Sequence, residues 1–243
     1  MNTQNVTDSL NTPILTLSGV SKSYGNAKEV LSNLNMTFPR GKVVGLLGPN
    51  GCGKTTLIKL ICGLHQPTSG TIILNGIPVG PESKAFISYL PERTYLPNDI
   101  SVSGLMSLFL DFFADFDAVR AENLLTAMGI DLNARIKTLS KGTKEKIQLI
   151  MTMSRRSPLY ILDEPIAGVD PAARDFILDT IFSNKPPEST IILSTHLIYD
   201  IEPVLDDVIF LGRNGVILGG SAKELREHYG KNIDQLFREV YRV

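Results

Sequence analysis

Short apolar runs alternate with turn residues along much of the chain, which is the pattern of β-strands separated by loops. The runs bounded by Gly or Pro predict strands at Ile14–Leu17, Leu31–Phe38, Lys42–Leu47, Thr71–Gly76 and Phe86–Leu90. Two later runs, Leu159–Leu162 and Thr190–Ser194, are apolar without interruption, as expected for strands buried on both faces of a parallel sheet. Asp207–Leu211 and Val216–Leu218 flank Asn214-Gly215, a pair that favours a hairpin turn.

Apolar residues fall at helical spacing in other parts of the chain. A predicted helical insert of about residues 93–156 has apolar positions at Leu105, Leu108, Phe109, Phe112, Leu124, Leu125, Met128, Ile147, Ile150 and Met151. Helices are also expected after Lys54 and at Asp170-Pro171, where Asp is a good N-cap and Pro suits the first helical position. Near the end of the chain, Ile233, Leu236, Phe237, Val240 and Tyr241 form one apolar face, which we interpret as packing on the body; binding of a partner is the alternative.

These elements predict an α/β fold with a mostly parallel core sheet, an antiparallel β lobe near the N-terminus and the inserted helical subdomain. We divide the chain into a disordered lead-in at residues 1–12, a main domain at 13–230 and an amphipathic helix at 231–243.

Composition excludes several classes of protein. The 243 residues are 43% apolar and 20% charged, with a net charge of −1. The chain therefore lacks the excess of basic residues that would indicate nucleic-acid binding. Two cysteines are too few for a disulfide framework, which favours a reducing cytosol. The N-terminus lacks the pattern of a signal peptide, and the most apolar stretch, Leu105–Ala114, is too short to span a bilayer and contains Asp111.

Residues Gly48–Thr55 match the phosphate-binding pattern G-x-x-x-x-G-K-[ST], between an apolar strand and a helix. Backbone N–H groups and the positive end of the helix dipole would converge on a polyphosphate, with Lys54 reaching its outer phosphates and Thr55 binding Mg²⁺. A glycine-rich turn with a chance lysine is the alternative, and the strand and helix context opposes it. The predicted nucleotide contacts of this loop are Gly48, Asn50, Gly51, Cys52, Gly53, Lys54, Thr55 and Thr56.

Asp163 and Glu164 end the apolar strand that begins at Leu159. An Asp at this position would emerge beside the phosphate loop and hold Mg²⁺ through water. The adjacent Glu164 is then placed to polarise an attacking water as general base. The alternative is that the pair only ends a strand and caps a helix, and that interpretation is poor once Lys54 is considered with it.

Leu139-Ser140-Lys141-Gly142-Thr143 precedes a helix shortly before the Asp163 strand. With the motifs above, it makes residues 14–225 similar to the nucleotide-binding subunits of ATP-binding cassette (ABC) transporters. The resemblance implies that Ser140, Lys141 and Gly142 complete the ATP site of an opposing subunit in a head-to-tail dimer. It further implies that Tyr24 stacks on adenine, that Glu92 replaces a Mg²⁺-contacting glutamine that senses the membrane partner, that Asp170 joins the two sites, and that His196 contacts the γ-phosphate.

Each of these positions has an ordinary structural alternative. Tyr24 could be a core aromatic at the end of a strand, and Glu92 a solvated charge in a loop. Asp170 could be only an N-cap, and a lone His after a strand is more often structural than catalytic. Their order along the chain favours the functional interpretation.

The chain departs from the family pattern at two motifs. Lys141 and Thr143 replace a glycine and a glutamine, and cations near a helix N-terminus oppose its dipole. One hypothesis is that Lys141 binds the γ-phosphate of the partner's site; the alternative is that it points into water. Glu92 in place of glutamine resembles the branch associated with export-type permeases, and its carboxylate could still coordinate Mg²⁺.

We therefore expect an ATPase that uses ATP and Mg²⁺ to power a membrane transporter. We expect this transporter to be an exporter. Its expected partners are transmembrane permease subunits and a second cassette, identical or different, and no nucleic acid. Its expected location is cytoplasmic, on the inner face of the cell membrane. The alternatives are a soluble ABC ATPase acting on nucleic acid or protein complexes, and a regulatory module without turnover. A GTPase is disfavoured because the chain lacks an Asn-Lys-x-Asp motif.

Overall fold

The computed structural model describes residues 12–25, 28–167, 169, 171–213 and 215–242, and their α/β architecture confirms the predicted fold class. Most of the predicted lead-in and Asn214 of the predicted hairpin turn lie outside these residues. With η for a 3₁₀ turn, the elements are β1 (Leu15–Tyr24), β2 (Lys28–Phe38), β3 (Val43–Leu47), α2 (Lys54–Ile61), β4 (Ser69–Leu74), β5 (Ile77–Pro78), η1 (Glu82–Phe86), β6 (Ile87–Leu90), α3 (Val102–Phe112), α4 (Ala118–Ala127), η2 (Ile136–Thr138), α5 (Lys141–Met153), β7 (Leu159–Asp163), α6 (Pro171–Ser183), β8 (Thr190–Ser194), α7 (Ile198–Ile201), η3 (Glu202–Val204), β9 (Asp207–Gly212), β10 (Gly215–Ser221), α8 (Ala222–Tyr229) and α9 (Ile233–Val240).

Within the described part of the chain, the strands form two sheets. One sheet has the order β2-β1-β4-β5 and is antiparallel throughout. The other has the order β10-β9-β3-β8-β7-β6, and all neighbours in it are parallel except β10 and β9. Every residue of β3, β7 and β8 is buried, which explains their continuous apolar sequences.

Strand β1 is longer than the sequence predicted, since it continues past Leu17 to Tyr24. The pairing of β1 with β2 shifts register between Leu17 and Val20, and Gly19 has a φ of 61° there. Such bulges let a strand continue through polar and glycine residues that interrupt a simple alternation.

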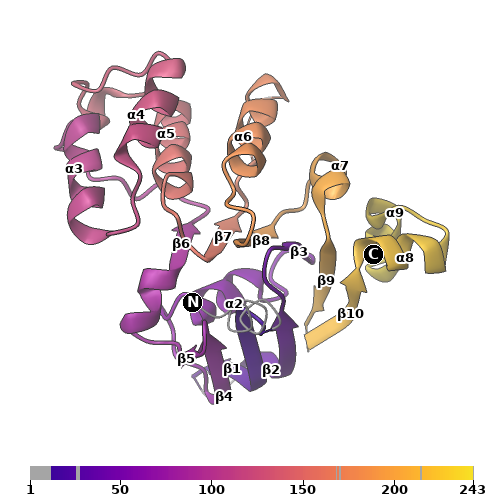
Figure 1. The fold of residues 1–243 in the computed structure, drawn as a ribbon. Helices are drawn as coiled ribbons and strands as arrows, with labels where there is room; N and C mark the ends of the chain where they lie inside the picture. The colour runs from indigo at the N-terminus through magenta and orange to yellow at the C-terminus, as the bar shows by residue number, and fades with distance from the viewer. Residues whose placement is uncertain (1–11, 26–27, 168, 170, 214, 243) are drawn as a thin grey trace, which may run out of the picture.

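Three hydrophobic clusters form the core of the described part of the chain. One lies between the antiparallel sheet, α2 and one face of the parallel sheet. A second joins the opposite face to α6, α7, α8 and α9. The third lies inside the helical insert, among α3, α4 and α5, so that this part of the molecule has a core of its own (Figure 1). No helix in the described ranges is long and apolar enough to cross a membrane.

The helices of the insert begin where the sequence provides a cap. The side chains of Ser101, Asp117 and Ser140 accept hydrogen bonds from backbone N–H groups of the first turns of α3, α4 and α5. These caps satisfy donors that a helix leaves free at its N-terminus.

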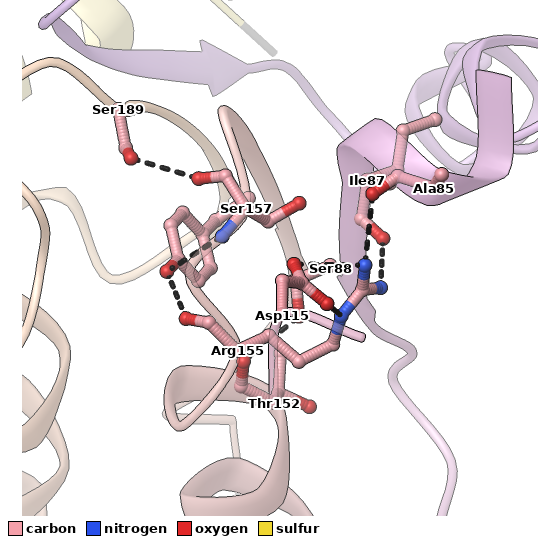
Figure 2. Close-up of polar contacts among 9 residues, drawn as sticks. Ala85, Ile87, Ser88, Asp115, Thr152, Arg155, Ser157 and Ser189 are labelled. Atoms are coloured by element: carbon pink, nitrogen blue, oxygen red, sulfur yellow. Dashed lines mark hydrogen bonds and ion pairs between the residues drawn. The ribbon is translucent and has the colours of Figure 1, made fainter. Parts of the chain in front are cut away.

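Arg155 joins the helical insert to the parallel sheet, as Figure 2 shows. Its side chain is 4% exposed, and the guanidinium contacts both carboxylate oxygens of Asp115, at 2.9 and 3.1 Å. It also donates to the carbonyl oxygens of Ile87 and Ala85 beside β6. The guanidinium group donates both to Asp115 of the helical insert and to carbonyl groups at the start of β6. It therefore fixes the position of the end of α5 relative to the sheet.

We predict that Arg155→Lys lowers the free energy of unfolding by about 2–4 kcal/mol. An ammonium cannot reproduce the fork of donors, so buried carbonyl and carboxylate oxygens lose their partners. Chemical denaturation at equilibrium measures the effect. The matched control is Arg156→Lys, because the neighbouring Arg156 makes a solvent-exposed pair with Asp117 and its replacement should leave stability nearly unchanged. Equal effects of the two substitutions would contradict this role for Arg155.

Candidate functional site

The carboxyl ends of β3, β8, β7 and β6 meet at one edge of the parallel sheet, where ligands bind in open α/β folds. Gly48, His196, Glu164 and Glu92 follow the ends of β3, β8, β7 and β6, respectively. The fold thus brings together residues that are distant in the sequence. His196, Glu164 and Glu92 line a pocket of about 400 Å³. Its full lining consists of Val30, Asn50, Gly51, Gly53, Lys54, Thr55, Thr56, Glu92, Asp163, Glu164, Ala167 and His196.

The segment of residues 48–53, called the phosphate loop here, leads from β3 into α2. Gly53, the N-cap of α2, has a φ of 108°, and a Cβ there would lie 2.7 Å from Leu31. Gly48 is equally constrained, since a Cβ would lie 2.5 Å from the carbonyl oxygen of Leu211. Among the described residues, no side chain caps the N-terminus of α2, which leaves its first N–H groups available to an anion.

Lys54 folds back into this loop. Its side chain is buried, and Nζ donates to the carbonyl oxygens of Gly48 at 2.7 Å and Pro49 at 3.3 Å. A buried ammonium stays charged only with such partners, and phosphate oxygens are a stronger set of acceptors than carbonyls. The loop therefore holds a cation at the base of the pocket.

Asp163 is 2% exposed and its two carboxylate oxygens differ. Oδ1 accepts from Ser194 Oγ at 2.6 Å, whereas Oδ2 is buried without a hydrogen-bond partner among the described residues. Burial raises the pKa of Asp163; the hydroxyls of Ser194 and Thr55 act in the opposite direction, and Glu92 adds to the increase. An unpartnered buried carboxylate oxygen in a polar pocket fits a hard cation.

In the described ranges, no group of three or more His, Cys, Asp or Glu side chains is placed to hold a metal ion alone. A cation at Asp163 would therefore need further oxygen atoms. Thr55 and Glu92, which line the same pocket, and a bound phosphate could supply them.

Glu164 is held in an unusual backbone conformation with a φ of 53°. Its N–H donates to the carbonyl oxygen of Ser194 at 3.0 Å, and its Oε2 lies 3.0 Å from Nδ1 of His196. The Glu164 side chain is 12% exposed and that of His196 is 55% exposed. A strained residue held by its neighbours often marks a functional site, and here it directs a carboxylate toward the pocket.

The structure thus brings most of the predicted site residues together. Gly48 lies beneath the pocket as an acceptor of Lys54, and Cys52 is buried within the loop. Val30 and Ala167 line the pocket but were not predicted as contacts. Val30 is one of several apolar residues on β2, so nothing in its sequence setting distinguished it.

Other predicted residues lie away from this pocket. Tyr24 is the last residue of β1 and is 44% exposed. Its ring packs edge-on against that of His65, with ring centroids 5.9 Å apart. Ser140, Lys141 and Gly142 are exposed at the start of α5, and Lys141 Nζ lies 3.7 Å from Glu145. Asp170 lies outside the described residues.

Comparisons with known proteins agree with this geometry. A family model described as "ABC transporter" matches residues 31–167. YhaQ, an uncharacterized ABC transporter ATP-binding protein of Bacillus subtilis, is 30% identical, over 90% of this chain and 74% of that protein. The Nod factor export ATP-binding protein I of Cupriavidus metallidurans is 31% identical, over 88% of this chain and 73% of that protein. A solved structure titled "Structure of ATP binding subunit of ABC transporter" has a TM-score of 0.85 at 30% identity, over 93% of this chain and 99% of that chain.

We predict that Asp163→Asn raises the free energy of unfolding at neutral pH. The raised pKa of Asp163 means that the folded protein holds this proton more tightly than the unfolded chain. Stability therefore falls as pH rises from the ordinary Asp pKa of about 3.9 through the raised pKa, and the full cost of the charge remains above it.

Chemical denaturation at pH 7 and near pH 4 tests this prediction. The gain in stability should be larger at pH 7, where the wild-type carboxyl is ionised in the unfolded chain. Asp111→Asn, at an exposed position, is the control and should change stability at neither pH. A gain of equal size at both pH values, or no gain, would show that burial of the charge is not costly.

Proposed function

The chain belongs to the ABC transporter family of ATP-binding proteins, ATPases that power transport, and we propose that it is the ATP-hydrolysing subunit of an exporter. One observation carries the residue-level proposal. The phosphate loop with Lys54, the partly unpartnered Asp163 and the Glu164–His196 pair line a single pocket. This is the set of groups that nucleotide binding and phosphoryl transfer to water require.

In this proposal the N-terminal turn of α2 binds the polyphosphate of ATP. Asn50, Gly51, Gly53 and Thr56 line the pocket and contribute the surface of the loop. Lys54 exchanges its loop carbonyl acceptors for phosphate oxygens. Gly48 and Cys52 support the loop from below.

Thr55, Asp163 and Glu92 would hold Mg²⁺. The unpartnered Oδ2 of Asp163 and the position of Glu92 in the same pocket support this assignment. When bound, the ion supplies neutralisation of charge on the outer phosphates.

Glu164 would act as general base by accepting a proton from the attacking water. The hydrogen bond between its carboxylate and Nδ1 of His196 sets the orientation of both side chains. The other ring nitrogen of His196 is then free to face the γ-phosphate, on the exposed side of the pocket.

Ser140, Lys141 and Gly142 would act on a second cassette. Their exposure at the N-terminus of α5, away from the pocket of their own subunit, supports a role across a dimer interface. Lys141 would have to leave Glu145, a weak exposed pair, to meet a phosphate. Tyr24 would stack on adenine and Asp170 would connect the two sites, as the family resemblance implies.

The proposed partner is a transmembrane permease, which would hold the subunit at the inner, cytoplasmic face of the membrane. The similarity to a Nod factor export protein and the carboxylate at Glu92 favour export. Exposed apolar side chains on the helical insert, including Leu110 and Phe112, offer area for contact with such a partner.

We predict that Glu164→Gln lowers the rate of ATP hydrolysis by about 10²–10⁴-fold, the usual contribution of a general base. Affinity for ATP should change little, because the amide keeps the size of the side chain. Steady-state turnover and calorimetric titration with ATP measure the two effects, and light scattering should detect an ATP-dependent dimer of the variant. Glu122→Gln, at an exposed position on α4, is the control. Turnover equal to that of wild type would exclude Glu164 as the base.

Purification from native membranes in mild detergent tests the transport function. A polytopic membrane protein should remain bound through a high-salt wash, and its identity would narrow the transported substrate. A tagged soluble protein from the same cells is the control for adventitious binding. If an active preparation instead retained only soluble proteins or nucleic acid, the function would be that of a non-transport ABC ATPase.

A further inference from the structure

Helix α9 lies beyond the segment that matches the family model, yet it contacts the surroundings of the pocket at both of its ends. It packs with α8 beside β9 and β10 (Figure 1). Its apolar face, with Ile233 and Leu236 buried, belongs to the hydrophobic cluster that covers the parallel sheet.

The N-terminal end of α9 is attached to the segment that follows His196. Glu202 accepts hydrogen bonds from the N–H groups of Ile233 at 2.8 Å and Asp234 at 3.5 Å. Between His196 and Glu202 lies α7, and both of its buried isoleucines pack in the cluster that contains α9. Packing and hydrogen bonds therefore connect the His196 segment to the start of α9.

The other end of α9 is attached to the base of the phosphate loop. Tyr241 Oη donates to the carbonyl oxygen of Leu211 at 3.0 Å. The carbonyl oxygen of Leu47 is a second acceptor, 3.4 Å from the same Oη. The Tyr241 ring packs against Phe237, with ring centroids 4.7 Å apart, and against Phe210 at 6.2 Å. Burial raises the pKa of Tyr241 above its usual range, which is consistent with a neutral hydroxyl held inside the structure.

These two carbonyl groups determine where the phosphate loop sits. Leu47 is the last residue of β3 and directly precedes Gly48. The Leu211 carbonyl is the group that a Cβ on Gly48 would meet at 2.5 Å, so the loop rests against it. Gly48 in turn accepts from Lys54 Nζ at 2.7 Å. Tyr241, Leu211, Gly48 and Lys54 thus form a continuous series of contacts into the pocket.

We propose that α9 is a strap that fixes the phosphate loop relative to the His196 segment, with Tyr241 and Glu202 as positioning residues for ATP binding and hydrolysis. The inference rests on the ATP site proposed above. Neither residue lines the pocket, so each acts through the backbone that it holds.

Tyr241→Phe tests the strap, because it keeps the ring packing and removes only the hydroxyl. The apparent Kd for ATP should rise about three- to tenfold, as expected for loss of one hydrogen bond that holds the loop. Turnover at saturating ATP should stay close to wild type. The matched control is Tyr229→Phe, which removes the hydroxyl of a half-exposed tyrosine on α8 and should leave Kd unchanged.

Glu202→Ala tests the other attachment, because it removes both carboxylate oxygens that accept from the start of α9, together with the ion pair to Arg226 at 3.8 Å. It should mainly lower kcat, since it loosens the segment of His196. In the double variant, the fold-decrease in kcat/KM should be smaller than the product of the two single fold-decreases. Once one end of α9 is released, the attachment at its other end no longer fixes the two segments relative to each other. The melting temperature of each variant separates loss of folding from loss of positioning.

A Kd for ATP in Tyr241→Phe equal to wild type would overturn the strap, whatever the change in melting temperature. So would effects of the two substitutions that multiply fully. If the wild-type protein itself bound no ATP, the proposed function would fall together with the inference; binding by wild type and by Tyr241→Phe alike would remove only the strap.

Discussion

The parallel pairing of β3, β8, β7 and β6 is the constraint on which the rest of the structure depends. Parallel strands end at the same edge, and the register that places Asp163 opposite Ser194 also fixes the distance between the Asp163 and His196 segments. Because these strands are buried on both faces, a slip in register would disturb close packing on both sides of the sheet and shift Asp163 away from Ser194. The hydrophobic core therefore sets the geometry of the pocket.

The pocket itself opposes stability. It contains a desolvated carboxylate oxygen at Asp163, a buried ammonium at Lys54 and a left-handed backbone conformation at Glu164. None of these features is favourable in isolation, and each persists because the surrounding sheet and loop hold it. A site that keeps charged groups dry before its ligand arrives gives them a strong interaction with that ligand, since little reorganisation remains to be done.

Local sequence signals were sufficient for much of this description. The phosphate loop and the strands at Leu159 and Thr190 were predictable because glycine conformation and continuous apolar runs depend on neighbouring residues alone. The packing of Tyr241 on the body was predicted from the apolar face of its helix, but its hydrogen bonds to Leu211 and Leu47 were not. The contacts of Val30 and Arg155 were also missed, because their partners, such as Ile87 for Arg155, are far away in the sequence. The full length of β1 was missed for a different reason, because bulges hide its alternation.

The joint at Arg155 has a mechanical consequence. Helix α5 runs from Lys141 to Met153 and ends beside this joint, while Ser140 lies at its far end. Thirteen residues of helix act as an arm of about 20 Å. A tilt of about 10° at the joint would therefore carry Ser140 through about 3.5 Å, slightly more than the length of one hydrogen bond. If the insert turned about the contacts of Arg155, a small change in angle would therefore be enough to make or break a contact at Ser140.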